Sequence, residues 1–148
     1  MQYVAYYKVG TLAPPPPGDW SVVAESICVV GVERHLRAVH SFARAVETAE
    51  RLNFTYGLTL ERQPQYRGTT EEIAVHGFAE VKGIFGKRRR SWRLGFVPGA
   101  VARKVGPAGT HSSEEVAVRL HAIFSGLGDF WEIRFALMVP HVAMRMAA

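Results

Sequence analysis

A helical period in the apolar residues begins at His35. From there, apolar side chains recur every three or four residues, and charged side chains occupy positions between them. The stripe consists of Val39, Phe42, Ala43, Val46, Ala49 and Leu52. An apolar stripe of this period with a charged opposite face predicts an amphipathic helix that packs against one side of a domain.

Short runs of β-branched and aromatic residues elsewhere predict strands. These runs are residues 2–9, 26–32, 54–60, 73–75 and 94–97. Apolar residues also alternate from Val116 to Phe124 and again from Phe130 to Val139, on either side of a Gly-Leu-Gly-Asp turn. This alternation favours a C-terminal β-hairpin over a helix that would start near Glu115.

Two further elements follow from turn and breaker residues. The fixed backbone of Pro98 suits the start of a short second helix over residues 99–105, which a Gly-Pro pair ends. Between residues 76 and 93 the chain makes a longer excursion. We expect this excursion to be a hairpin arm whose tip is the basic segment at residues 87–93.

These elements together predict a single mostly-β domain of the α+β class over residues 1–148. A proline-rich connector at residues 10–19 and a polar loop at residues 61–72 link the strands, and residues 141–148 form a tail. A chain of 148 residues can bury roughly 70% of the surface that its unfolded form exposes, so it needs no disulfide framework.

The charge balance favours an anionic partner. The net charge is +5 and the pI is about 9.7, and a clustered positive field attracts polyanions. The single cysteine, Cys28, cannot form an intrachain bridge, which is typical of a reducing compartment. The N-terminus lacks a signal-peptide pattern, and no apolar run approaches the roughly 18 residues of a membrane-spanning helix. We therefore expect a cytoplasmic protein with no membrane partner.

The densest positive charge surrounds a tryptophan. The segment consists of Lys87, Arg88, Arg89, Arg90, Ser91, Trp92 and Arg93. Cations of this kind neutralise phosphates, while an indole can stack on a base. The segment is therefore a candidate nucleic-acid contact. The alternative interpretation is a solvated hairpin tip whose tryptophan turns back onto the core.

Three stretches together resemble the HIRAN domain family. They are VVGV (residues 29–32), RQPQYRGTTEEIAV (residues 62–75) and LGFVP followed by AVARKV (residues 94–105). The family motif R-E-P-x-N-P-Y-D-x-N-A-I-x-V precedes a strand that ends in G-[YH]-[LV]-P. This chain keeps Arg62, Pro64, Ile73, Ala74, Val75, Gly95, Val97 and Pro98 of that pattern. The resemblance covers about residues 26–139.

The resemblance implies a small β-barrel of the oligonucleotide-binding type, which in this family captures single-stranded DNA at a free 3′ end. It places Arg34, His35, Tyr66 and Arg67 on loops at the ligand-facing end, with Arg62 in the motif and Phe96 as a residue that stacks on a base. Gly68 and Thr69 stand where the family has an aromatic residue and an acid. Tyr66, two positions earlier, is a candidate substitute for that aromatic residue.

The sequence lacks the patterns of common catalytic and metal sites. The six histidines show no metal-ligand spacing, and no nucleophile elbow or phosphate-binding glycine loop occurs. We therefore expect a non-enzymatic protein without a cofactor. The favoured function is binding of single-stranded nucleic acid or of DNA ends and junctions, with DNA favoured over RNA. The alternative is a structural or interaction subunit of a larger nucleoprotein complex, which contacts RNA or DNA only together with partner chains.

Overall fold

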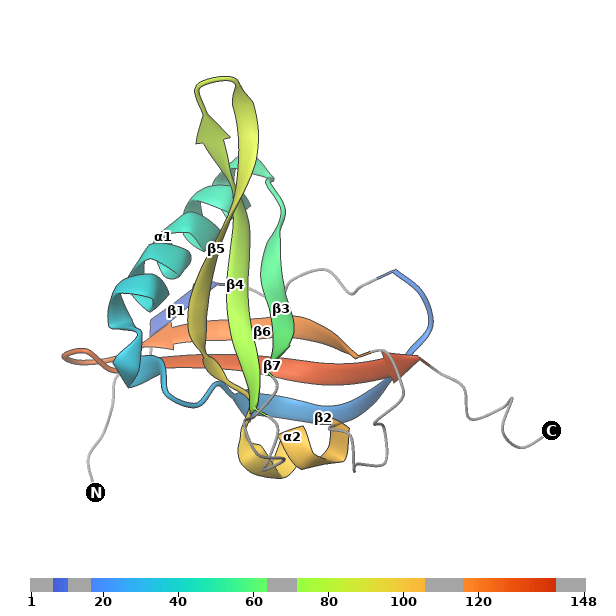
Figure 1. Ribbon diagram of the computed structural model, residues 1–148. Coiled ribbons are helices and arrows are strands. Elements are labelled where there is room, and N and C mark those ends of the chain that lie inside the picture. The colour runs from blue at the N-terminus through green and yellow to red at the C-terminus, as the bar shows by residue number, and fades with distance from the viewer. Residues whose placement is uncertain (1–6, 11–16, 64–71, 106–115, 141–148) are drawn as a thin grey trace.

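The computed structural model describes residues 7–10, 17–63, 72–105 and 116–140 (Figure 1). Seven strands, a 3-10 helix and two α-helices follow one another in these segments. In chain order they are β1 (Tyr7–Gly10), β2 (Trp20–Cys28), η1 (Val32–Arg34), α1 (Leu36–Leu52), β3 (Tyr56–Gln63), β4 (Glu72–Gly83), β5 (Gly86–Phe96), α2 (Gly99–Val105), β6 (Ala117–Ser125) and β7 (Trp131–Pro140).

The strands form two antiparallel sheets. One has the order β1-β6-β7-β2 and the other the order β3-β4-β5. The second sheet stands across the first, and α1 lies along one side of it (Figure 1). The prediction of a mostly-β α+β fold with two α-helices is confirmed. Among the described residues the strand pairing does not continue from one sheet into the other as a closed barrel.

Within the segments that the structure describes, one isolated backbone bridge joins the two sheets at one corner. The N–H of Val30 donates to the carbonyl of Phe96, and the N–H of Phe96 donates to the carbonyl of Val30, both at 2.8 Å. Gly95 lies directly beside this bridge, where a Cβ atom would overlap the carbonyl oxygen of Val30. The close approach of the two sheets therefore requires glycine at this position.

The core lies between α1 and the two sheets. Phe42 on α1 is fully buried, and its ring centroid is 5.9 Å from that of Trp92 on β5. A Cβ on Gly77 would lie 2.6 Å from the Phe42 ring, so the glycine lets the helix approach β4 closely. The predicted stripe on α1 is buried at Val39, Phe42, Ala43, Val46 and Ala49. Leu52 is the exception, because it is 41% exposed in the last turn of the helix.

The predicted C-terminal hairpin and second helix are confirmed. Strands β6 and β7 pair in antiparallel register, and the N–H of Gly126 closes their turn on the carbonyl of Phe130 at 2.9 Å. The α2 helix begins after Pro98, whose carbonyl accepts hydrogen bonds from the N–H groups of Val101 and Ala102.

Several predicted strand boundaries are wrong. The strand predicted at 26–32 runs from Trp20 to Cys28 instead, and Gly31, with a φ of 85°, begins the turn into η1. Strand β3 runs to Gln63 and therefore includes the start of the predicted 61–72 loop. The predicted strand at 73–75 is part of the 12-residue strand β4. Residues 2–6, most of the proline-rich connector and the tail at 141–148 lie outside the described residues.

We predict that Gly95→Ala destabilises the fold by about 1–3 kcal/mol, because a backbone carbonyl must move to admit the added methyl group. The matched control is Gly99→Ala at the start of α2, where no atom lies within 4 Å of the added Cβ. We expect the control to leave the stability unchanged or slightly raised. Urea unfolding followed by circular dichroism measures both variants, and equal stabilities would contradict the account of the corner.

Candidate nucleic-acid interface

The β4–β5 hairpin extends beyond the third strand of its sheet. Strand β3 pairs with β4 only as far as Ala79, whereas β4 and β5 continue to pair up to Gly83 and Gly86. The paired residues 80–83 and 86–89, with the turn between them, form a projecting two-stranded ribbon that we call the arm (Figure 1). The prediction of a long hairpin arm at this place is confirmed.

The tip of the arm differs from the prediction. Ile84 and Phe85 form the turn, and the basic residues predicted at the tip lie along β5 instead. Successive side chains of a strand point to opposite faces of its sheet. Lys87, Arg89 and Arg93 therefore lie on one face, while Arg88 and Arg90 share the other face with Trp92.

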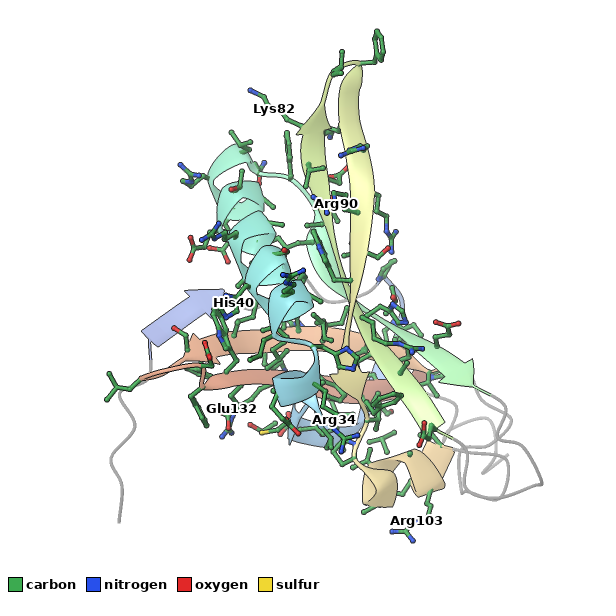
Figure 2. The ribbon with its side chains drawn as sticks, turned by 60° about the vertical axis from the view of Figure 1, so that its left-hand side comes forward. Arg34, His40, Lys82, Arg90, Arg103 and Glu132 are labelled. Atoms are coloured by element: carbon green, nitrogen blue, oxygen red, sulfur yellow. The ribbon has the colours of Figure 1, made fainter. Side chains whose placement is uncertain are left out.

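This hairpin carries the whole excess of positive charge. Residues 80–93 contain six of the 18 lysine and arginine residues but one of the 13 acidic residues, Glu80. Their net charge is therefore +5, which equals the net charge of the chain, and the remaining residues sum to zero. Figure 2 shows Lys82 and Arg90 on the hairpin, with Arg103 of α2 at the opposite end of the molecule.

Trp92 is unsuited to the stacking role that the sequence suggested. It is 9% exposed and belongs to the core cluster, where its indole packs on Phe42. Burial follows from the alternation of the strand, because Trp92 stands opposite Gly77 on the side of the sheet that α1 covers. Binding of a base to this indole would require the helix to separate from the sheet.

Two phenylalanines lie on the other side of this sheet. Burial alternates along β4, so that Phe78 and Glu80 are half-buried while Gly77 and Ala79 are buried. The half-buried set faces away from α1, and we call this side the outer face. It includes His76, Phe78 and Glu80 from β4 and Lys87, Arg89, Arg93 and Phe96 from β5. No motif in the sequence marks Phe78 as a site residue, although its alternation with Glu80 is visible there.

Four cations of β5 lie against aromatic rings. The guanidinium carbon of Arg89 is 3.9 Å from the centroid of Phe78, and that of Arg93 is 5.7 Å from Phe96. Arg90 lies 5.0 Å from Trp92 on the opposite face, and the ammonium of Lys87 lies 5.3 Å from Phe54. These distances are typical of cation–π contacts, which orient a cation without using its hydrogen-bond donors. The donors of the three arginines therefore stay available for an anion.

Glu80 links the arm to the body of the protein. Its carboxylate accepts a hydrogen bond from the N–H of Thr55 at 2.7 Å, and its own N–H donates to the carbonyl of Thr55 at 2.8 Å. The ammonium of Lys87 lies 3.7 Å from the same carboxylate. The backbone N–H of Thr55, with a smaller contribution from Lys87, lowers the pKa of Glu80.

A second group of predicted residues meets at the lower end of β5. The His35 ring lies 6.5 Å from the ring of Phe96 and is tilted by 59° to it, and Arg93 approaches the same Phe96 ring. Arg34 is the last residue of η1, directly before His35, and it is exposed. The structure thus brings Arg34, His35, Arg93 and Phe96 together beside the bridge between the sheets.

The acidic side chains of the outer face contact groups other than the two arginines, although Glu80 stands opposite Arg89 in the strand pairing. Nε2 of His76 lies 2.9 Å from Oε2 of Glu61 on β3. Glu80 is held by Thr55 and Lys87. Arg89 and Arg93 therefore form a positive row along β5, which is an edge strand.

The remaining predicted site residues cannot be placed with the others. Arg62 lies in β3 opposite Ile73, and its side chain is outside the described residues. Tyr66, Arg67, Gly68 and Thr69 also lie outside the described residues. In the described segments no three histidine, cysteine, aspartate or glutamate side chains gather as metal ligands. None of the described helices is long and apolar enough to cross a membrane.

No family model, curated protein or solved structure matches the chain. The resemblance to the HIRAN family therefore stays a prediction from the quoted motif.

We predict that acid weakens the anchoring of the arm. A lowered pKa means that the ionised Glu80 contributes stability above the ordinary value of 4.5 and loses it as the pH falls through the lowered pKa. Glu80→Gln should therefore be less stable than the wild type at pH 7, and the difference should shrink below that ordinary value. Chemical unfolding at a series of pH values measures the difference, and a constant gap across the series would contradict the assignment.

Proposed function

We propose that this chain binds single-stranded DNA, without catalysis, along the outer face of the β3-β4-β5 sheet. Lys87, Arg89 and Arg93 hold the phosphates, and Phe78 and Phe96 with the guanidinium groups above them stack on the bases. His35 and Arg34 extend the surface at the lower end. The observation that carries the proposal is the location of the whole net charge on one hairpin, with two of its arginines against half-buried aromatic rings.

The charge distribution supports a polyanionic ligand. A net charge of +5 spread over a whole surface gives a weak local field, whereas the same charge on residues 80–93 gives a strong one. Lys87 and Arg89 stand two residues apart on the same face, which corresponds to about 7 Å along a strand. A row of cations along an edge strand suits a linear chain of phosphates better than a single compact anion.

The ring contacts support recognition of bases. Arg89 is held over Phe78 before any ligand binds, so less side-chain entropy is lost when its donors meet a phosphate. The planar guanidinium and the rings also provide surfaces on which a base can stack, whatever its sequence. Stacking combined with phosphate contacts is typical of proteins that bind single strands with little sequence preference.

We also propose that the two sheets are an opened version of the barrel that the HIRAN resemblance implies. The backbone bridge between Val30 and Phe96 supports this relationship, because it continues the pairing from the end of β2 to the end of β5. It places Phe96 and His35 at the point where the sheets meet. The proposal includes no preference for a free 3′ end, since Gly68 and Thr69 replace the residues that give it in the family.

A subunit of a nucleoprotein complex is the second candidate function. The observation in its favour is the tip of the arm, where Ile84 is 95% exposed and Phe85 is 101% exposed. Large apolar side chains in such positions are often covered by a partner. In this version of the proposal a partner protein covers the tip while the cations of β5 contact the nucleic acid.

We predict that replacing both Arg89 and Arg93 by alanine weakens binding to a labelled oligothymidylate and lowers its salt dependence. Each lost phosphate contact should reduce the slope of log K against log salt by about 0.7 on a single strand. Fluorescence anisotropy at several salt concentrations measures the slope. The matched control replaces Arg103 and Lys104, both exposed on α2, and removes the same charge. An equal loss in the control would assign the affinity to net charge alone.

We predict that Phe78→Leu weakens the same binding by about 1–3 kcal/mol, because leucine keeps the apolar volume but offers no ring for stacking. Trp92→Phe is the comparison, since Trp92 lies in the core. It should lower the unfolding midpoint and leave the affinity of the folded protein unchanged. The opposite pattern, with affinity sensitive to Trp92 and insensitive to Phe78, would contradict the choice of the outer face.

A further inference from the structure

The tip of the arm presents two large apolar side chains to solvent. Ile84 and Phe85 form a two-residue turn between the paired residues Gly83 and Gly86, and both side chains are almost fully exposed. Turns of this length usually contain asparagine, aspartate or glycine. An apolar pair at this place gains nothing from the folded chain itself, so its side chains are available to a partner.

Glycines on both sides make this turn possible. Gly86 has a φ of 111°, a value that residues with a side chain rarely adopt, and a Cβ on Gly83 would lie 2.8 Å from the carbonyl oxygen of Gly86. The chain therefore reverses in the space of the two apolar residues. Behind them, the side chains of Lys82, Lys87 and Arg88 line the space beside the turn. The arm thus ends in an apolar point that is backed by cations.

We propose that the arm enters a groove of duplex DNA next to the bound single strand and that Ile84 and Phe85 insert between base pairs at the junction. This inference rests on the proposed function and adds its substrate class, a junction of single-stranded and duplex DNA. Proteins that bend or open a duplex insert apolar side chains such as isoleucine and phenylalanine between base steps, while cations nearby neutralise the phosphates. The arm combines both features.

The dimensions of the arm fit DNA. Four residue pairs, from Glu80 opposite Arg89 to Gly83 opposite Gly86, extend beyond the end of the β3 pairing. They span about 10 Å at roughly 3.3 Å per residue, and the turn adds to that length. The grooves of B-DNA are about 7.5 to 8.5 Å deep, and strands of DNA-binding proteins enter either of them. The major groove of an RNA duplex is too narrow for protein side chains to read, so the geometry favours DNA.

The charge of the arm favours DNA over a protein as the occupant. Lys82 and Arg88 line the space beside the two apolar side chains, and Glu80, the single acidic residue of the arm, is already engaged by Thr55 and Lys87. A protein partner would have to supply a strongly acidic rim around a small apolar pocket. Duplex DNA supplies phosphates on both sides of a stacked apolar interior, which matches this arrangement.

The test uses a forked DNA with 2-aminopurine at the first base pair of the duplex, since the fluorescence of this base rises when it unstacks. The full chain is compared with the double variant Ile84→Ser, Phe85→Ser. The control variant is Leu127→Ser, which also removes an exposed apolar side chain from a hairpin turn, being 69% exposed in the wild type. Anisotropy with single-stranded DNA is measured on the same three proteins, so that binding and insertion are read separately.

We expect the wild type and Leu127→Ser to raise the 2-aminopurine fluorescence, and the double tip variant to lose most of that rise. All three proteins should bind the single strand with affinities within about two-fold of one another, because substitutions of exposed side chains away from the contact change little. With the 2-aminopurine moved to the middle of the duplex, the wild type should give no rise.

Two outcomes overturn the inference. If the wild type binds the single strand but gives no rise at the junction, or if the tip variant gives the same rise, the tip does not insert, and a protein partner becomes its expected contact. A tip-dependent rise in a protein with no affinity for the single strand would instead support the inference and overturn the proposed function. A wild type that binds neither DNA overturns both.

Discussion

The packing of Phe42 against β4 and β5 determines which side of the long hairpin is buried. Its ring lies against Gly77, where a Cβ would come within 2.6 Å, and against the indole of Trp92. Once these two positions face the helix, the alternation of the strands assigns the neighbouring side chains of the hairpin to a face. A register shift between Arg93 and Gly95 then puts Phe96 on the outer face. Ala79 and Leu94 turn inward, while Phe78, Arg89 and Arg93 turn outward. One helix–sheet contact thus sets the orientation of the candidate interface.

The cations of the β4–β5 hairpin lie outside the core for a physical reason. Six cations cannot be buried without partners at any reasonable cost, so a hairpin that carries them must keep them in solvent. Here the strands project beyond the sheet, and the cations near the body lie on aromatic rings. The arginine side chains cover the apolar faces of the rings, and the rings hold the charged groups in place. The same contacts that shield Phe78 therefore prepare a surface for phosphates.

Periodicity predicts the elements of this chain better than it predicts their faces. The helix stripe from Val39 to Ala49, the C-terminal hairpin and the proline-started α2 follow from local pattern, and all three are present. The tip of the arm is harder to predict from the basic run, because Ile84 and Phe85 lack the residues typical of a tight turn. The charge pattern therefore predicts a tip at the cations, although Gly83 and Gly86 mark the real one. Trp92 stands two residues before Leu94, so strand alternation assigns both side chains to the core. The contact of Phe78 with Arg89 follows only from the register of β4 with β5. Whether the sheets are a barrel opened at one corner depends on long-range pairing that no local pattern encodes.

The proposed function requires that single-stranded DNA lies on the outer face of the β3-β4-β5 sheet. The most direct test is a titration of the ¹⁵N-labelled protein with an oligothymidylate, followed by amide NMR. The account predicts that the largest chemical-shift changes fall on β4 and β5 around Phe78, Arg89 and Arg93 and continue to His35 and Phe96. Changes confined to the exposed side of α1 or to α2, with the hairpin unaffected, would contradict it.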